Sequence, residues 1–441
     1  MIINIKRKEV IIMKTNELKT ALKKGDFNEK IRYMYACEEE KASFYAGRYE
    51  EIIDGFAEAF EYEPEEMRLF SAPGRTEIGG NHTDHQHGCV LAASLNLDVI
   101  GAVALNGRDE IRIKSKGYPM DIIRLDELEP SESEYDRASA LIRGVVSKIK
   151  DMGYTIKGFD AYTVSSVLKG SGMSSSAAFE VLVGTIINGL FCNEEIDAVQ
   201  IAQIAQYAEN VYFGKPCGLM DQMASSVGAV VAIDFADTEK PVVNKVEYDF
   251  TKSGYSLCII DSGADHADLT NEYAAITVEM RMVANYFGKD FLREVDPKEF
   301  SDKLAEVRAA VKNDRAILRA IHYFNDNIRA QEEVEALRED DFERFLDIVK
   351  KSGRSSFMYL QNVYASSMPE QQAVSLTLAL CDEILGDAGA SRVHGGGFAG
   401  TVQAFVPNES VKEFKEKIEA VLGEGMCHIL SIRPVGGIEL K

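Results

Sequence analysis

Residues 170–178 read GSGMSSSAA, that is Gly170-Ser171-Gly172-Met173-Ser174-Ser175-Ser176-Ala177-Ala178. They follow an extended apolar segment and open a run with few helix breakers. Glycines let a backbone approach a ligand closely, and the first turn of a helix offers unpaired N–H groups and a positive dipole. The stretch therefore predicts a phosphate-binding loop. It lacks the Gly-Lys-Ser/Thr ending of a Walker A loop, and a helix cap with spare serines would have the same sequence.

Segments with strand and helix patterns lie on both sides of this loop without a regular βαβ rhythm. We expect strands at 69–74 (ending in a turn), 89–105, 111–113, 158–168, 229–235, 256–261, 400–406 and 427–434. We expect helices at 136–152, 177–191, 196–211 and 409–422 and over most of 272–377. The helix at 177–191 is apolar on nearly every side and should be buried. The pattern favours an α+β fold.

The chain has 441 residues, which is more than one hydrophobic core usually serves, so two domains are expected. Residues 14–66 are charged and have helical spacing, and they predict an N-terminal helical extension that serves packing or oligomer contacts. We expect Met13, where the helical pattern opens, to be the start of the protein. The predicted boundaries are 1–66 for the extension, 67–255 for an N-terminal domain and 256–441 for a C-terminal domain.

The net charge of −22 argues against a nucleic-acid or anionic-membrane surface. The seven cysteines are widely spaced and contain no CxxC pair, which is typical of reduced thiols in a cytoplasmic protein. No stretch reaches a membrane-spanning length, and the N-terminus has no signal-peptide pattern. We expect a cytoplasmic monomer or weak homo-oligomer.

A second polar stretch, GRTEIGGNHTDHQH at 74–87, lies between two strand-like segments. Arg75 can contact a phosphate with two N–H groups or hold a carboxylate. His82 and Asp84 are suitable partners for sugar hydroxyls. The three histidines of the stretch could also bind a metal, but no cysteine or acidic cluster with metal-ligand spacing accompanies them.

Two further patterns are candidates for a site. Asp221 lies between Met220 and Met223, and a carboxyl group in such apolar surroundings is a candidate general base. The run GGGFAG at 395–400 matches GxGxxG, but it leads into a strand instead of a helix, so a dinucleotide-binding loop is excluded. A glycine run between a helix and a strand indicates close approach to a ligand or to another backbone.

The order of these motifs resembles that of galactokinases, a family of the GHMP small-molecule kinase superfamily. Residues 71–84 resemble the sugar signature, 170–178 followed by Glu180 resemble the phosphate loop, and 389–400 resemble the glycine-rich third motif. Residues 216–222 are similar to the segment that carries the catalytic aspartate. The resemblance covers residue 60 to the end. It implies a ribosomal-protein-S5-like unit in the N-terminal domain, a C-terminal α+β domain and a site between them.

The resemblance also implies a role for each matching residue in a kinase that phosphorylates the C1 hydroxyl of a galactose-like sugar with ATP and Mg²⁺. Asp221 would take the proton, and Arg75 would keep Asp221 ionised and neutralise transition-state charge. Residues 170–177 would bind the nucleotide. Magnesium would be held by Glu209 and a serine of the 174–176 turn, with Ser175 and Ser176 as the candidates. The sugar-binding residues would be Asn81, His82, Asp84, Gly218 and Tyr273.

The chain departs from the family pattern at four positions. The family has Asn at the position of Glu77, Glu at that of Asn81, Tyr at that of His85 and Thr at that of His394. An amide at position 81 would not repel a sugar that carries a carboxylate, so a galacturonate kinase is an alternative. A catalytically silent sugar sensor on the same fold is another, although the phosphate loop and Asp221 are both present.

Overall fold

The computed structural model describes residues 13–167, 173–215, 217–264 and 269–441. Their strands form an eight-stranded and a four-stranded sheet. The strands are β1 (Arg68–Gly79), β2 (Cys89–Leu105), β3 (Glu110–Ser115), β4 (Met120–Arg124), β5 (Phe159–Ser165), β6 (Val230–Asp234), β7 (Val242–Val246), β8 (Tyr255–Asp261), β9 (Ala390–Val393), β10 (Thr401–Pro407), β11 (Cys427–Leu430) and β12 (Ile438–Leu440).

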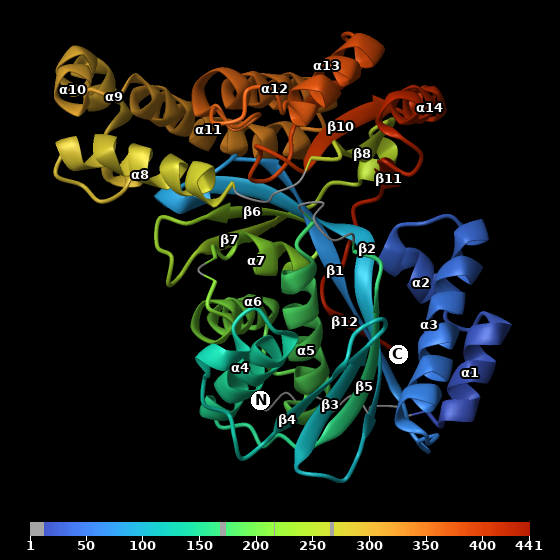
Figure 1. Ribbon diagram of the computed structural model, residues 1–441. Coiled ribbons are helices and arrows are strands. Elements are labelled where there is room, and N and C mark those ends of the chain that lie inside the picture. Colours follow the sequence, from blue (N-terminus) through green and yellow to red (C-terminus); the bar gives the residue numbers. More distant parts are fainter. Residues whose placement is uncertain (1–12, 168–172, 216, 265–268) are drawn as a thin grey trace, which may run out of the picture.

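Helices cover both sheets (Figure 1). The first seven are α1 (Thr15–Lys24), α2 (Asn28–Tyr35), α3 (Glu39–Phe60), α4 (Ala138–Asp151), α5 (Ser175–Phe191), α6 (Ala198–Tyr207) and α7 (Met220–Val227). The later ones are α8 (Thr270–Tyr286), α9 (Pro297–Asp302), α10 (Leu304–Val311), α11 (Asp314–Arg338), α12 (Phe342–Ser355), α13 (Ala373–Leu385) and α14 (Val411–Leu422). None of the described helices is both long and apolar enough to cross a bilayer.

The larger sheet has the strand order β12-β1-β2-β5-β3-β4, and β6 pairs with both β2 and β7. Strand β2 lies at its centre, and successive side chains of a strand point to opposite faces. Ile100, Ala102 and Ala104 pack into the apolar cluster formed with α1–α3, whereas Val99 and Val103 pack on the other side with α4–α6. The sheet is therefore buried on both faces (Figure 1).

The predicted N-terminal helical extension is present as α1–α3, the blue helices along one face of the larger sheet (Figure 1). Its apolar stripe, which includes Leu18, Ile31 and Phe56, is buried against strands of the same chain. Packing within the chain thus accounts for these residues. Residues 1–12, including the segment before the suggested start at Met13, lie outside the described residues.

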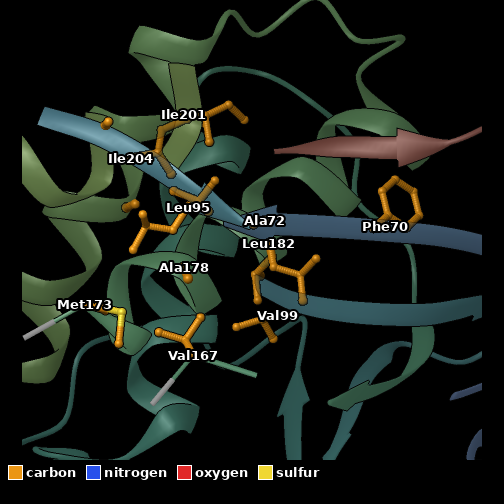
Figure 2. Close-up of a cluster of buried hydrophobic side chains, with 14 of the residues drawn as sticks. Phe70, Ala72, Leu95, Val99, Val167, Met173, Ala178, Leu182, Ile201 and Ile204 are labelled. Carbon is orange, nitrogen blue, oxygen red and sulfur yellow. The ribbon is translucent and has the colours of Figure 1, made fainter. Parts of the chain in front are cut away.

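The prediction of a buried helix after the serine-rich loop is confirmed by α5, which packs against β1, β2, α4 and α6. Figure 2 shows Ala178 and Leu182 of α5 among Ala72, Leu95 and Val99 of the sheet. The start of this helix is therefore fixed by packing along much of its length, which holds its free N–H groups at one place in the molecule.

Two local predictions were wrong. The first was the short strand ending in a turn at Pro73-Gly74, because β1 continues to Gly79. The register shifts between Pro73 and Arg75, so the chain forms a bulge there, which tolerates a proline that has no N–H to donate. The second concerned the glycine run, which lies between strands β9 and β10 instead of between a helix and a strand.

The smaller sheet, of order β11-β8-β10-β9, contains only strands that follow residue 254, close to the predicted boundary at 255. Strand β12 also follows residue 254, but it belongs to the larger sheet, where Leu440 pairs with Leu69 of β1. The chain thus returns to its N-terminal sheet at its end. The division into domains at 66 and 255 stays a prediction.

Candidate active site

A cavity of about 460 Å³ lies where the end of β1, the start of α7, the start of α8 and the 394–400 loop come together. Predicted site residues from distant parts of the sequence form its wall: Arg75, His82, Asp84, Gly218, Asp221 and Tyr273. The wall also includes Glu77, His85, Lys215, Cys217, Met220, Ala274, Thr277, Gly395 and Gly396. The fold thus brings together all but one of the residues predicted to handle a sugar.

Arg75 and Asp221 form a two-pronged ion pair in this cavity. Arg75 Nε lies 2.6 Å from Asp221 Oδ1, and its terminal Nη2 lies 2.8 Å from Oδ2. The Ser174 hydroxyl also donates a hydrogen bond to Asp221 Oδ2. Because the backbone N–H of Arg75 donates to Met173 O, β1 is joined directly to the serine-rich loop. The pair is therefore held between the sheet, the loop and α7.

The electrostatics keep Asp221 ionised. Removal from bulk solvent raises the pKa of this carboxyl group, but the charge and hydrogen bonds of Arg75, with the Ser174 hydroxyl, outweigh that effect and hold the pKa below its ordinary value. An ionised carboxylate of this kind can accept a proton from a hydroxyl group placed against it.

Two further polar groups of the cavity wall, His82 and Tyr273, are fixed by the glycine-rich loop. Burial and the nearby His85 lower the pKa of His82 to about 4, so its ring is neutral at pH 7. His82 Nε2 lies 2.9 Å from Gly396 O, and because a carbonyl only accepts, Nε2 carries the proton and Nδ1 is left as an acceptor. The Tyr273 hydroxyl donates to Gly397 O at 2.8 Å.

Gly218 and Asp84 are in close contact across the cavity wall. A Cβ atom on Gly218 would lie 2.9 Å from Asp84 Oδ2, which is closer than such atoms approach without a shift. The absence of a side chain at position 218 therefore allows the Asp84 carboxylate to take its place in the wall.

The prediction that Asn81 contacts the sugar does not match its position, because the side chain is fully buried behind the wall. Its Nδ2 group donates to Glu77 Oε1 at 2.9 Å and to Gly395 O at 2.7 Å. Its Oδ1 accepts from Ser356 and from Asn362. All donors and acceptors of the amide are used within the protein, so none is left for a ligand. The residue that does reach the wall is Glu77.

A second cavity, of about 940 Å³, lies at the start of α5 and includes Ser175 and Ser176 in its wall. Its wall also includes apolar residues such as Val167 and Phe179. Among the predicted nucleotide-binding residues, the side chains of Met173 and Ala177 are buried, with Met173 in the core beside Val167 (Figure 2), so only their backbones are available to a ligand. Gly170, Ser171 and Gly172 lie outside the described residues.

Glu209 lies near this second cavity, on the π-helical turn Ala208–Phe213. Its Oε1 is 3.5 Å from the Ser176 hydroxyl, and its Oε2 accepts from Gln222 at 2.7 Å. The same Gln222 amide donates to Glu180 Oε2, while Glu180 Oε1 is buried without a partner. Burial raises the pKa of both carboxyl groups. Such a pair would be stabilised by a cation.

No group of three or more His, Cys, Asp or Glu side chains in the described ranges is arranged to hold a metal ion. The three histidines of the 74–87 stretch do not gather, because His87 stacks on Phe291 while His82 and His85, with ring centroids 5.8 Å apart, line the first cavity. Mg²⁺ needs only one or two carboxylates when a nucleotide supplies phosphate oxygens, so Ser175, Ser176 and Glu209 fit such an ion.

Several wall residues were not predicted from the sequence. Lys215 and Cys217 line the first cavity, and Arg392 holds Glu77 from behind at 2.7 Å. In the sequence, Glu77 stands out only as a departure from the galactokinase pattern. Its alternation with Arg75 on one strand face was the available signal, since residues two apart on a strand share a face.

Comparisons with known proteins agree with this arrangement. Residues 140–229 match the family model for the GHMP kinases N terminal domain, and residues 54–105 match the galactokinase galactose-binding signature. The fold and the site thus define a GHMP kinase.

Relatives and solved structures narrow the class. A galactokinase from Actinobacillus pleuropneumoniae serotype 3 (strain JL03) is 33% identical over 360 residues, which are 79% of this chain and 87% of that protein. A galactokinase from Glaesserella parasuis serovar 5 (strain SH0165) is 32% identical over 352 residues, with the same shares. The crystal structure of Lactococcus lactis galactokinase complexed with galactose superposes with a TM-score of 0.73 at 25% identity and covers 88% of this chain and 98% of that one. The chain belongs to the galactokinase family.

Proposed function

We propose that the protein transfers the γ-phosphoryl group of ATP to the C1 hydroxyl of galactose. The observation that carries this is the Arg75–Asp221 pair, which lines the first cavity and is linked through Ser174 to the loop that lines the second. Ser174 bonds to Asp221 in the first cavity, and the next two residues, Ser175 and Ser176, line the second. A sugar in the first cavity and a nucleotide in the second would meet at this loop.

In this proposal Asp221 accepts the proton of the C1 hydroxyl while the sugar oxygen forms a bond to the γ-phosphorus and the bond to the ADP oxygen breaks. Phosphoryl transfer passes through a loose transition state, so the nucleophile needs its proton removed only late. An ionised acceptor of lowered pKa is sufficient for that. Arg75 orients Asp221 and places positive charge beside the transferred group.

Glu209, Ser175 and Ser176 would hold Mg²⁺ together with the phosphates, and the ion would neutralise charge that develops on them. The unpartnered oxygen of Glu180 and the raised pKa values of Glu180 and Glu209 support a cation at this place. The free N–H groups at the start of α5 would bind phosphate oxygens.

We also propose a cytoplasmic location and no nucleic-acid partner. The seven cysteines are all free thiols, and the net charge is −22. A monomer or weak homo-oligomer remains our expectation, since α1–α3 bury their apolar faces within the chain.

The experiment is an ADP-release assay with ATP and a panel of hexoses, with the product identified by NMR as the 1-phosphate. Galactose should be the preferred sugar. Asp221→Asn should lower kcat by at least about 100-fold, because an amide cannot accept the proton, while the protein still folds and binds galactose. A kcat like that of the wild type in this variant would remove Asp221 from the mechanism, and a sensor with no turnover would refute the proposed activity.

A further inference from the structure

The side chain of Glu77 has one oxygen bound within the protein and one left over. Oε1 accepts from Arg392 at 2.7 Å and from Asn81 at 2.9 Å. For Oε2 the described residues provide no hydrogen-bond donor, and this atom is not among the buried polar atoms that lack a partner. Oε2 is therefore accessible to solvent. Because Glu77 is only 5% exposed and lines the first cavity, Oε2 is accessible from that cavity.

Its position along β1 relates this oxygen to the reacting group. Arg75 and Glu77 pair in unbroken register with Ser94 and Ala92 of β2, so their side chains leave the same face about 7 Å apart. That is roughly the width of a pyranose ring. With C1 against Asp221, Glu77 lies at the remote end of the sugar, where C4 and C6 are found.

We infer that Glu77 is the specificity-determining residue of the sugar pocket. Its free oxygen accepts a hydrogen bond from a hydroxyl group at the remote end of the sugar and repels a sugar that carries a carboxylate there. Asn81 and Arg392 are positioning residues that hold the other oxygen. This inference rests on the proposed function and deepens it, since it assigns the substrate to the neutral hexoses and excludes uronates.

The charges around the cavity support the inference that uronates are excluded as substrates. Three carboxylates line it, those of Glu77, Asp84 and Asp221. The Arg75 charge is already paired with Asp221, and Lys215 is exposed at the wall. The amide of Asn81, which suggested tolerance of a uronate, has no free hydrogen-bonding group. A second carboxylate brought against Glu77 would be a close like-charge pair.

The decisive variant is Glu77→Gln. Arg392 and Asn81 both donate, so the amide oxygen of Gln will turn toward them and the NH₂ group toward the cavity. An acceptor is thereby replaced by a donor. We expect kcat/KM for galactose to fall about 10- to 100-fold, mainly through KM, and the ratio of galactose to galacturonate kcat/KM to fall at least as much. Glu409→Gln, an exposed residue far along the chain, is the matched control and should leave both sugars unchanged.

The same variant is then combined with 3-, 4- and 6-deoxygalactose. In the wild type, removal of the hydroxyl that Glu77 holds should cost about 10-fold or more in kcat/KM, whereas in Glu77→Gln the same removal should cost little, because the interaction is already lost. Strictly additive losses for all three sugars would overturn the inference.

If Glu77→Gln fails to fold, Glu77→Asp tests the role of the negative charge separately from the position of the free oxygen. It keeps a negative charge beside Arg392 but withdraws the oxygen, so galactose should be used less well while galacturonate stays excluded. A gain on galacturonate in Glu77→Asp, or an unchanged sugar ratio in Glu77→Gln, would refute the role of Glu77. Failure of the wild type to phosphorylate galactose would instead refute the proposed function.

Discussion

Arg48 on α3 lies 2.7 Å from Asp98 Oδ1 and donates a 3.2 Å hydrogen bond to the Ser166 hydroxyl. Asp98 is fully buried on β2 and also accepts from Tyr35, Ser71 and Arg433. Ser166 stands between Ser165 and Val167, two residues of the second cavity. A side chain of the N-terminal helices therefore holds a residue whose two chain neighbours line the cavity in which we place the nucleotide.

The first prediction concerns this contact. Arg48→Met should lower the free energy of unfolding by about 2 kcal/mol, because Asp98 loses one of its two buried cationic partners while Arg433 remains. It should also raise KM for ATP several-fold with KM for galactose kept. Urea unfolding and steady-state kinetics measure the two effects. Arg32→Met removes an exposed pair with Glu39 and is the control, with an expected change below about 1 kcal/mol. Equal effects of the two substitutions would contradict the assignment.

The second prediction concerns pH. In the wild type the pKa of Asp221 is held below its ordinary value, so kcat should not fall through protonation of this carboxylate until the pH is well below neutral. In Arg75→Met the guanidinium group no longer opposes the effect of burial on Asp221, so the pKa of Asp221 rises. The acidic limb of the kcat profile should therefore move to higher pH. Profiles between pH 5 and 9 test this. Arg75→Lys keeps the charge and should move the limb less, and an unmoved limb in Arg75→Met would argue against Asp221 as the base.

Much of the site could be predicted because its groups lie in short motifs whose order is informative. Arg75, His82, Asp84, Gly218, Asp221 and Tyr273 were chosen from the sequence and line one cavity. The buried helix α5 could be predicted as well, since an apolar run without breakers has few other solutions.

The face of the sheet to which a side chain points could not be predicted where the strand is irregular. The register of β1 with β2 shifts between Pro73 and Arg75 and again between Glu77 and Gly79, and each shift breaks the alternation from which a face is read. The face of Asn81, which lies beyond both shifts, therefore could not be assigned by counting, and Glu77 could be compared with Arg75 only once β1 was known to continue past Gly74. The groups that hold them, Arg392 and Asn362, are more than 280 positions away in the chain, and no local pattern reports such a contact.

The third prediction concerns the metal. Glu209→Ala should lower kcat about 10- to 100-fold at millimolar Mg²⁺, and a higher concentration of the ion should restore part of the loss, because carboxylate and phosphate oxygens hold Mg²⁺ together. Activity as a function of magnesium concentration measures this. Glu239→Ala removes an exposed carboxylate and should have no effect. A loss that is the same at every magnesium concentration would show that Glu209 acts otherwise than as a ligand.

The fourth prediction concerns the contact between Gly218 and Asp84. In Gly218→Ala the new Cβ would lie 2.9 Å from Asp84 Oδ2, and the carboxylate at the end of a short flexible side chain will move in preference to the backbone. Position 218 has no positive φ, so alanine is not strained there, and the free energy of unfolding should change by less than about 1 kcal/mol. KM for galactose should rise about 10- to 100-fold, since a sub-ångström displacement of a positioning group is costly, while kcat changes less. Gly47→Ala, on α3 with no atom within 4 Å of the added Cβ, is the matched control and should raise stability slightly through helix propensity without changing KM. An unchanged KM in Gly218→Ala would mean that Asp84 does not hold the sugar.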